Sequence, residues 1–147
     1  MAKPSTPLFV VVVGCGRLGS HLANRMSAAG HSVVVIDSDE GAFASLSAEY
    51  SGFTVEGDAA ELAVLRSAKL SQADVVIAAT REDNLNLMVA QVARGIFGVK
   101  RALARVLDPR REEVYRVLQI DTVCPTTVAA DIFADLLSTA MTEGEGR

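Results

Sequence analysis

The stretch Phe9-Val10-Val11-Val12-Val13-Gly14-Cys15-Gly16-Arg17-Leu18-Gly19 decides the fold of this chain. Its five apolar residues predict a buried strand, and the residues after Gly19 predict a helix that continues to Ala28. The glycines between them have the spacing G-x-G-x-x-G. In this context the first permits a tight turn, the second lets a pyrophosphate approach the backbone, and the third lets the helix pack on the strand. The free N–H groups of the helix start then face the anion.

The same alternation of strand and helix continues along the chain. Short apolar runs, mostly rich in β-branched residues, are the strand candidates: Leu8–Val13, Val33–Ile36, Phe53–Val55, Val75–Ala79, Ala102–Val106 and Thr122–Val123. Helix-length segments lie between them, near residues 17–29, 40–49, 59–67, 83–94 and 110–118. Strands that alternate with helices form right-handed crossovers and a parallel sheet. The fold class is therefore predicted as α/β: a Rossmann-type, doubly wound, mainly parallel six-stranded sheet, with a C-terminal amphipathic helix.

Bulk properties favour one cytoplasmic domain. We expect a disordered segment at 1–7, a nucleotide-binding domain at 8–124, a C-terminal helix at 125–140 and a disordered tail at 141–147. The run Leu8–Val13 is far shorter than the roughly 20 residues of a membrane span, and the start of the chain does not resemble a signal peptide. The net charge of −4 argues against nucleic-acid binding. The two cysteines show no metal or disulfide spacing, so both are expected to be reduced.

The predicted C-terminal helix carries an apolar stripe. Apolar residues recur there at helical spacing, whereas Asp131 and Asp135 lie on the other face. The stripe consists of Val128, Ala129, Ile132, Phe133, Leu136, Leu137 and Ala140. Two interpretations remain open at this point: the stripe packs on its own domain, or it contacts a second copy or another partner.

Asp37 ends the second predicted strand, 18 residues beyond Gly19. In dinucleotide-binding domains a carboxylate near this place binds the adenosine ribose hydroxyls. The alternative is a carboxylate that only caps the strand end or the next helix. Ser38, a further candidate binding residue, is followed by Asp39 and Glu40, so no arginine stands ready for a ribose 2′-phosphate. NADP is therefore disfavoured, whereas NAD(H) and ATP/ADP both suit the site.

Two side chains of the glycine turn have further hypotheses attached. Arg17 is either a solvated residue of the first helical turn or a bidentate phosphate ligand. Cys15 is expected to serve as a small residue, with redox sensing as a minor alternative because a helix N-terminus can lower a thiol pKa. Nothing suggests catalysis, since His21, His31 and Asp108 have no partner that the sequence places beside them. We therefore assign no catalytic residue and no metal site, and expect no enzyme.

With these motifs assembled, residues 8–140 resemble the N-terminal lobe of the RCK (KTN) family, cytosolic nucleotide-sensing regulators of potassium channels and transporters that include the TrkA proteins. The resemblance rests on five segments together: Val-Gly-Cys-Gly-Arg-Leu-Gly at 13–19, Val-Ile-Asp at 35–37, Glu-Gly-Asp-Ala at 56–59, Ala-Ala-Thr-Arg-Glu-Asp-Asn at 78–84 and Ala-Arg-Val at 104–106. The chain ends before the smaller C-terminal lobe that family members usually carry.

The resemblance implies roles for particular residues. Residues 14–19 would hold the phosphates and Asp37 the ribose, while Asp58 and Ala59 would form the adenine side of the pocket. Thr80 and Arg81 would lie over the phosphates or the distal part of the nucleotide. Arg105 would reach the distal phosphate or second nucleoside, although it could also be a solvent-facing arginine at a strand end. The argument from parallel strands also places Thr80 and Arg105 at the ligand crevice.

The resemblance also implies partners. The helix at 125–140 resembles the crossover through which two lobes pair, giving a homodimer or a larger ring beneath a membrane potassium transporter or channel. The chain would then sit in the cytoplasm at the inner face of the membrane without inserting into it. The leading hypothesis is a regulator that senses NAD(H) or ATP/ADP and transmits binding through lobe rearrangement. The alternatives are an NAD-dependent oxidoreductase fragment and an assembly module with a vestigial pocket.

Overall fold

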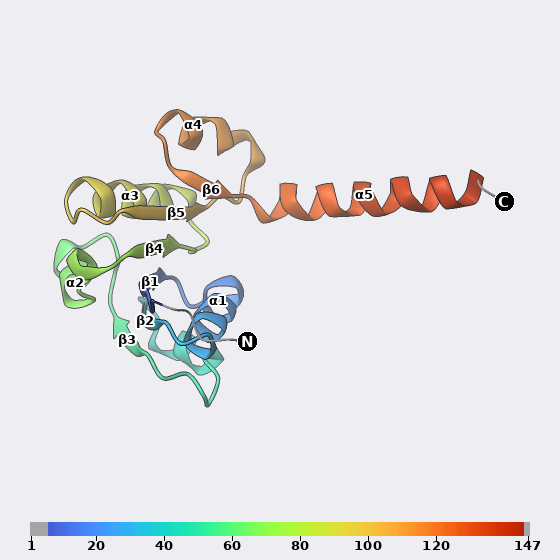
Figure 1. Ribbon diagram of the computed structural model, residues 1–147. Coiled ribbons are helices and arrows are strands. Elements are labelled where there is room, and N and C mark those ends of the chain that lie inside the picture. Colours follow the sequence, from blue (N-terminus) through green and yellow to red (C-terminus); the bar gives the residue numbers. More distant parts are fainter. Residues whose placement is uncertain (1–5, 146–147) are drawn as a thin grey trace.

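The computed structural model describes residues 6–145 and contains a six-stranded sheet (Figure 1). The strands are β1 (Phe9–Val13), β2 (Ser32–Asp37), β3 (Phe53–Glu56), β4 (Val75–Ala78), β5 (Arg101–Arg105) and β6 (Asp121–Val123). Their order is β3-β2-β1-β4-β5-β6, and every neighbouring pair is parallel. The predicted Rossmann-type α/β fold is confirmed.

The helical segments agree with the sequence at some places and not at others. They are α1 (Arg17–Ala28), η1 (Glu40–Ser45), α2 (Leu62–Ser67), η2 (Leu70–Gln72), α3 (Asp83–Gly95), η3 (Pro109–Arg111), α4 (Glu112–Val117) and α5 (Pro125–Glu145). The prediction of a helix at 40–49 is wrong, because the structure has a short 3₁₀ segment there. Asp39 accepts a hydrogen bond from the Gly41 N–H at 2.9 Å, and glycine and serine are weak helix formers. The segment expected at 59–67 becomes helical only from Leu62.

The two faces of the sheet carry separate apolar layers. Val11 and Val13 point to the face covered by α2, η2 and α3, whereas Val10 and Val12 point to the face covered by α1 and η1. All four valines are almost completely buried. A strand that is covered on both sides must be apolar at every position, which explains the uninterrupted valines of β1.

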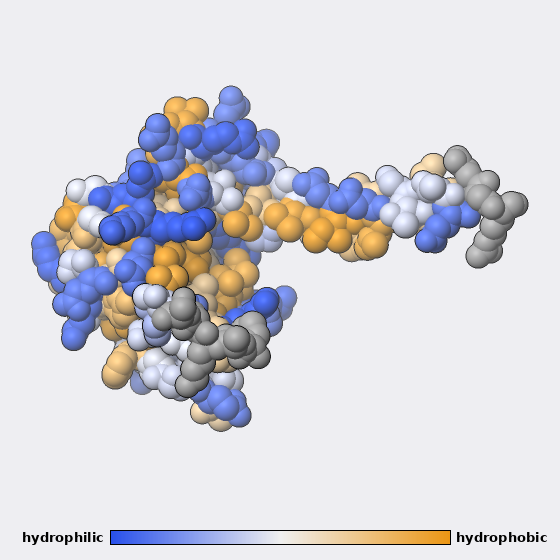
Figure 2. Space-filling view, in the orientation of Figure 1, coloured by the Kyte–Doolittle hydropathy of each residue, from blue (hydrophilic) through white to orange (hydrophobic). Residues whose placement is uncertain are grey.

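Helix α5 projects away from the sheet (Figure 1). Its stripe is exposed, with 73% of Phe133 and 63% of Leu136 accessible, and forms a continuous apolar band in Figure 2. The interpretation that the stripe packs on its own domain is therefore wrong. The helix also extends beyond residue 140, since Ala140, Met141 and Glu143 are good helix formers. Residues 1–5 and 146–147 of the predicted terminal segments lie outside the described residues.

Within residues 6–145, no helix combines the length and apolar character that a membrane crossing requires.

Candidate nucleotide-binding site

A cleft of about 640 Å³ opens at the carboxyl ends of β1 and β4, where the strand order reverses. Val13 is in register with both Ile36 and Ala78, so β1, β2 and β4 end at the same level. This switch point is where doubly wound sheets bind ligands, and the volume is that of an ordinary ligand pocket. The cleft is lined by Val13, Gly14, Gly16, Arg17, Ile36, Asp37, Ser38, Asp39, Ala42, Gly57, Asp58, Ala59, Ala79, Thr80, Arg81, Glu82, Leu85 and Arg105.

The three glycines of the turn meet different surroundings. Gly14 has φ +101°, and a Cβ there would lie 2.9 Å from the Ala79 carbonyl oxygen. A Cβ on Gly19 would lie only 1.7 Å from the Gly14 carbonyl oxygen, so α1 packs directly on the turn. A Cβ on Gly16 would meet nothing within 4 Å. The open side of Gly16 is therefore where an anion can approach the backbone.

Asp37 joins the glycine turn to the loop after β2. Its Oδ2 accepts a hydrogen bond from the Cys15 N–H at 2.7 Å, and its Oδ1 accepts one from the Asp39 N–H at 2.8 Å. A carboxylate has about four acceptor sites, so each oxygen can accept a further hydrogen bond from a hydroxyl. The strand-end role and the ribose role of Asp37 are thus chemically compatible.

Three residues of the predicted turn support the site without lining it. Gly19 is buried against the strand, and Leu18 packs in the apolar layer on the α1 side of the sheet. The Cys15 thiol is 1% exposed, and burial followed by the charge of Asp37 raises its pKa. The idea that the helix N-terminus lowers this pKa is wrong, because the loss of hydration outweighs the helix dipole. Cys15 contributes its backbone N–H to the turn.

The β3 side of the cleft is formed by the loop after that strand. The Gly57 N–H donates to the Asp37 carbonyl at 3.0 Å and brings the loop against β2. Asp58 and Ala59 line the cleft as expected. Asp58 is exposed and accepts from the Ala60 N–H at 2.9 Å, whereas Ala59 is 5% exposed. An acceptor beside a small apolar surface is chemically suited to the edge and face of a purine.

The opposite side of the cleft carries its positive charge. Arg17, Arg81 and Arg105 all line it, and Arg17 and Arg81 are exposed. Arg105 is half-buried, and its buried Nε has no hydrogen-bond partner among the described residues. An unsatisfied buried donor is costly unless a ligand or water accepts from it. The arginines and the open Gly16 thus fit the phosphates of a nucleotide, while Asp37 fits its ribose.

Several lining residues were not predicted. Asp39, Ala42, Gly57, Glu82 and Leu85 belong to the loops after β2, β3 and β4 or to the helices that follow. Asp39, Gly57 and Glu82 adjoin predicted residues, which is the only signal for them in the sequence. Ala42 and Leu85 have no such signal, because loop and helix geometry decides which residues face the cleft.

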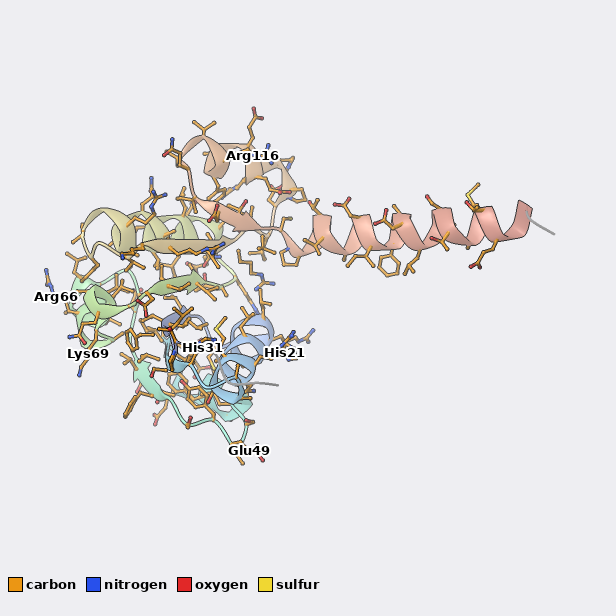
Figure 3. All side chains as sticks on the ribbon, viewed as in Figure 1. His21, His31, Glu49, Arg66, Lys69 and Arg116 are labelled. Carbon is orange, nitrogen blue, oxygen red and sulfur yellow. The ribbon has the colours of Figure 1, made fainter. Side chains whose placement is uncertain are left out.

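The two histidines lie away from the cleft. His21 is exposed on α1, and Figure 3 labels His31 near the start of β2. The Leu8 N–H donates to Nδ1 of His31 at 3.0 Å, at the amino end of the sheet. The cleft opens at the carboxyl end, and neither histidine is among the residues that line it.

The fold and the cleft together define a Rossmann-type nucleotide-binding domain. The TrkA-N domain family model matches residues 10–126, and the chain belongs to this family. The Trk system potassium uptake protein TrkA of Streptomyces coelicolor is 41% identical over 124 residues, which cover 84% of this chain and 56% of that protein. The TrkA homologue of Methanothermobacter thermautotrophicus is 32% identical over 132 residues, which cover 89% and 61%. The chain therefore spans little more than half of these relatives.

Solved structures show the same fold. The TrkA-N domain of the Escherichia coli inner membrane protein ybaL has a TM-score of 0.79 at 21% identity, covering 91% of this chain and 99% of that domain. The GsuK protein has also been solved bound to ADP and, as a channel, bound to NAD. Each of these structures has a TM-score of 0.66 and covers 84% of this chain; they are 19% and 20% identical and are covered over 33% and 22% of their length.

Proposed function

We propose that this chain is the nucleotide-sensing part of a cytosolic regulator of potassium uptake or of a potassium channel. The observation that carries the proposal is the single cleft that brings together the open face of Gly16, the carboxylate of Asp37 and the unsatisfied Nε of Arg105. These groups suit a phosphate chain and a ribose. The TrkA relatives support the potassium system as the setting.

The ligand in this proposal is an adenine nucleotide, either NAD(H) or ATP/ADP. Asp58 and Ala59 would form the adenine side, Ser38 would lie beside the ribose, and Thr80 with Arg81 would cover the phosphates. Asp37 and Asp39 line the ribose end, so a 2′-phosphate there would meet like charge. NADP is disfavoured for this reason. The domain is proposed to span 8–124.

The proposed assembly is a homodimer or a larger ring in which α5 contacts a second copy. The exposed stripe supports this because contiguous apolar surface on a helix marks an interaction site. A membrane transporter or channel subunit would hold the assembly at the inner face of the membrane. Binding would change the arrangement of paired domains only if the nucleotide has unequal affinity for the two arrangements.

An oxidoreductase fragment is the second candidate, because the glycine turn and Asp37 suit NAD. It is weaker, since the lining residues of the cleft include carboxylates and arginines but no histidine, cysteine, lysine or tyrosine as proton donor. We propose a binding role without catalysis. An assembly module with a vestigial pocket is the third candidate.

Calorimetric titration with ATP, ADP, NAD, NADH and NADP tests the proposal, with Asp37→Ala as the variant and Asp131→Ala as the matched control. Asp131 is an exposed aspartate on α5, far from the cleft in sequence. We expect binding of ADP or NAD, loss of at least tenfold in affinity in Asp37→Ala, and wild-type affinity in Asp131→Ala. Failure of all five nucleotides to bind the wild type would contradict the proposal and favour the assembly module. Oxidation of NADH with a carbonyl substrate would favour the reductase.

A further inference from the structure

Asn86 is a fully buried polar side chain in the first turns of α3. Its exposed fraction is 0%, and among the residues the structure describes only Ser20 is another buried polar residue. Val89, Ala90 and Ala93 of the same helix belong to the apolar layer. Burying an amide in such surroundings is costly unless its donors and acceptors are all used. The position therefore calls for a physical reason.

The Asn86 side chain makes four hydrogen bonds with two residues of the cleft. Its Oδ1 accepts from the Thr80 N–H at 2.9 Å and from the Thr80 hydroxyl at 2.6 Å. Its Nδ2 donates to the Thr80 carbonyl at 3.1 Å and to the Arg105 carbonyl at 2.9 Å. Every donor of the amide is used, so the side chain has one defined orientation.

These hydrogen bonds lie just beyond the end of the pairing between β4 and β5. The pairing of these strands ends at Ala78 and Ala104, while β5 continues to pair with β6 through Arg105 and Val123. Thr80, two residues beyond Ala78, and Arg105, one residue beyond Ala104, lie outside the ladder between β4 and β5. The Asn86 amide offers one acceptor and one donor side by side, like a peptide group, and joins the two segments where backbone pairing has ended.

Both segments face the phosphate side of the cleft. Thr80 lies against the glycine turn, since a Cβ on Gly14 would come within 3.0 Å of the Thr80 nitrogen. Arg105 carries the unsatisfied Nε. Asn86 itself does not line the cleft. A shift of its amide would therefore move Thr80, which lies against the glycine turn, and the backbone of Arg105.

We propose that Asn86 is the positioning residue for the phosphate side of the nucleotide site. It fixes Thr80 and Arg105 relative to each other, so that their groups meet the phosphates without rearrangement. Pre-positioned groups raise affinity because less ordering is needed on binding. The inference rests on the proposed nucleotide binding and goes beyond it, since it assigns phosphate affinity to a residue that does not line the cleft.

The test compares ADP with adenosine in the wild type, Asn86→Ala and Asn84→Ala. Asn84 lies on the same helix, is exposed and accepts from Arg111 at 3.0 Å, so it is a matched control. We expect Asn86→Ala to lose about tenfold or more in ADP affinity while adenosine affinity stays within twofold. Asn84→Ala should leave both unchanged. Equal losses for ADP and adenosine, or no loss for either, would overturn the inference even though nucleotide binding itself stands.

A conservative variant separates positioning from packing. Asn86→Asp has almost the same shape, but its carboxylate cannot donate to the carbonyls of Thr80 and Arg105. Protonation restores one donor, so ADP affinity relative to the wild type should recover as the pH falls from 8 to 6, because burial raises a carboxyl pKa. An affinity ratio that does not change with pH would contradict the positioning role.

A measurement on the wild type keeps the inference testable if the Asn86 variants do not fold. In ¹⁵N NMR spectra, the Asn86 side-chain amide signal should shift on addition of ADP and remain in place on addition of adenosine. Shifts of the Gly14 and Gly16 amides with ADP, without a shift of the Asn86 signal, would overturn it. If no amide responds to ADP, the proposed function has failed as well, which is a different outcome.

Discussion

At the scale of single residues, the site depends on backbone atoms as much as on side chains. Asp37 binds the Cys15 N–H, and Gly16 leaves its own backbone uncovered. The structure requires glycine at Gly19 for packing. The proposed function requires it at Gly16 for access of the phosphates to the backbone. These two requirements can be separated experimentally, because a methyl group meets backbone at one position and open space at the other.

Gly16→Ala is expected to fold and to bind ADP or NAD at least tenfold more weakly, because the methyl group occupies the approach to the backbone. Gly19→Ala is expected to lose about 3 kcal/mol in the free energy of unfolding, because α1 must move off the turn. Urea unfolding and calorimetric titration measure the two effects. Wild-type affinity in Gly16→Ala would show that phosphates do not approach there.

Tyr50 makes the stability of the fold depend on pH in the alkaline range. Its hydroxyl donates to the carbonyls of Val33 at 3.1 Å and Phe53 at 2.8 Å, and burial, followed by the charge of the Cys15 thiolate, raises its pKa to about 12. The folded state thus holds the proton more tightly than the unfolded state, whose tyrosine titrates near 10. The contribution of the protonated Tyr50 to the free energy of unfolding is fully present below pH 10 and is lost as the pH rises towards 12.

The unfolding free energy should accordingly fall between pH 10 and 12, and Tyr50→Phe should make that fall shallower. Part of the fall should persist, because burial also raises the pKa of Cys15 and Tyr115. At pH 8 the variant should be less stable by about 1 kcal/mol from the lost hydrogen bonds. Urea unfolding at pH 8 and pH 11 checks both statements, and an unchanged slope in Tyr50→Phe would refute the assignment to Tyr50.

At the scale of elements, α5 has a separable role. Its stripe contributes little to the fold, since Phe133 is 73% exposed and Leu137 is 63% exposed. Phe133→Asp should therefore leave the unfolding free energy within about 0.5 kcal/mol of the wild type. It should abolish the proposed self-association, because a charge in an apolar contact is costly. Sedimentation velocity measures the association.

Ser138→Asp provides the control for this experiment, because Ser138 lies on the opposite side of α5 from the stripe and is exposed. It adds the same charge to the same helix and should leave association unchanged. Dissociation in both variants would indicate a general charge effect. Association that survives Phe133→Asp would mean that the stripe does not form the contact.

The strands could be predicted from the sequence because continuous runs such as Val10–Val13 have only one stable environment, a sheet covered on both faces. The 3₁₀ segment at 40–45 could not be predicted, because apolar residues recur at 40–49 with the spacing of a helix. The hydrogen bond between Asp39 and Gly41 that competes with a helix is not visible in that pattern. The direction of α5 was also beyond the sequence. An amphipathic helix predicts that a stripe is covered, without saying by which surface.

In the candidate site, too, local motifs could be predicted and contacts between distant segments could not. Asp37 and residues 14–19 were accessible to prediction because they belong to one short motif whose spacing has a known geometry. Asn86 was not, since its partners Thr80 and Arg105 come from different strands and meet only in the folded sheet. The Cys15 thiol shows a third case. Its position in the turn between β1 and α1 follows from the motif, but its burial depends on packing against the other segments of that layer.

At the scale of the whole molecule, hydrogen bonds connect the wall of the cleft to the start of α5. Asp83, at the start of α3, accepts from the Leu107 N–H at 2.7 Å, and its carbonyl accepts from the Tyr115 hydroxyl at 2.8 Å. On the same helix as Tyr115, Glu112 accepts from the Thr127 hydroxyl at 2.8 Å. These contacts connect the loop region beside the cleft with the first turn of α5.

A spin label at Ser138→Cys would measure coupling between the cleft and α5 in the proposed dimer. The label reacts selectively, because Cys15 and Cys124 are buried. If the nucleotide controls the arrangement of two domains, the distance between the two labels should change on addition of ADP or NAD, and adding the Asp37→Ala substitution should remove the change. An unchanged distance at saturating nucleotide would show that binding does not alter the assembly.

The length of α5 would amplify a change in its orientation. A helix of 21 residues is roughly 30 Å long, and only its first residues bond to the rest of the domain among the contacts described. In the proposed assembly, α5 would act as a lever whose pivot lies near Pro125. A tilt of about 10° near Pro125 would displace the far end of α5 by roughly 5 Å.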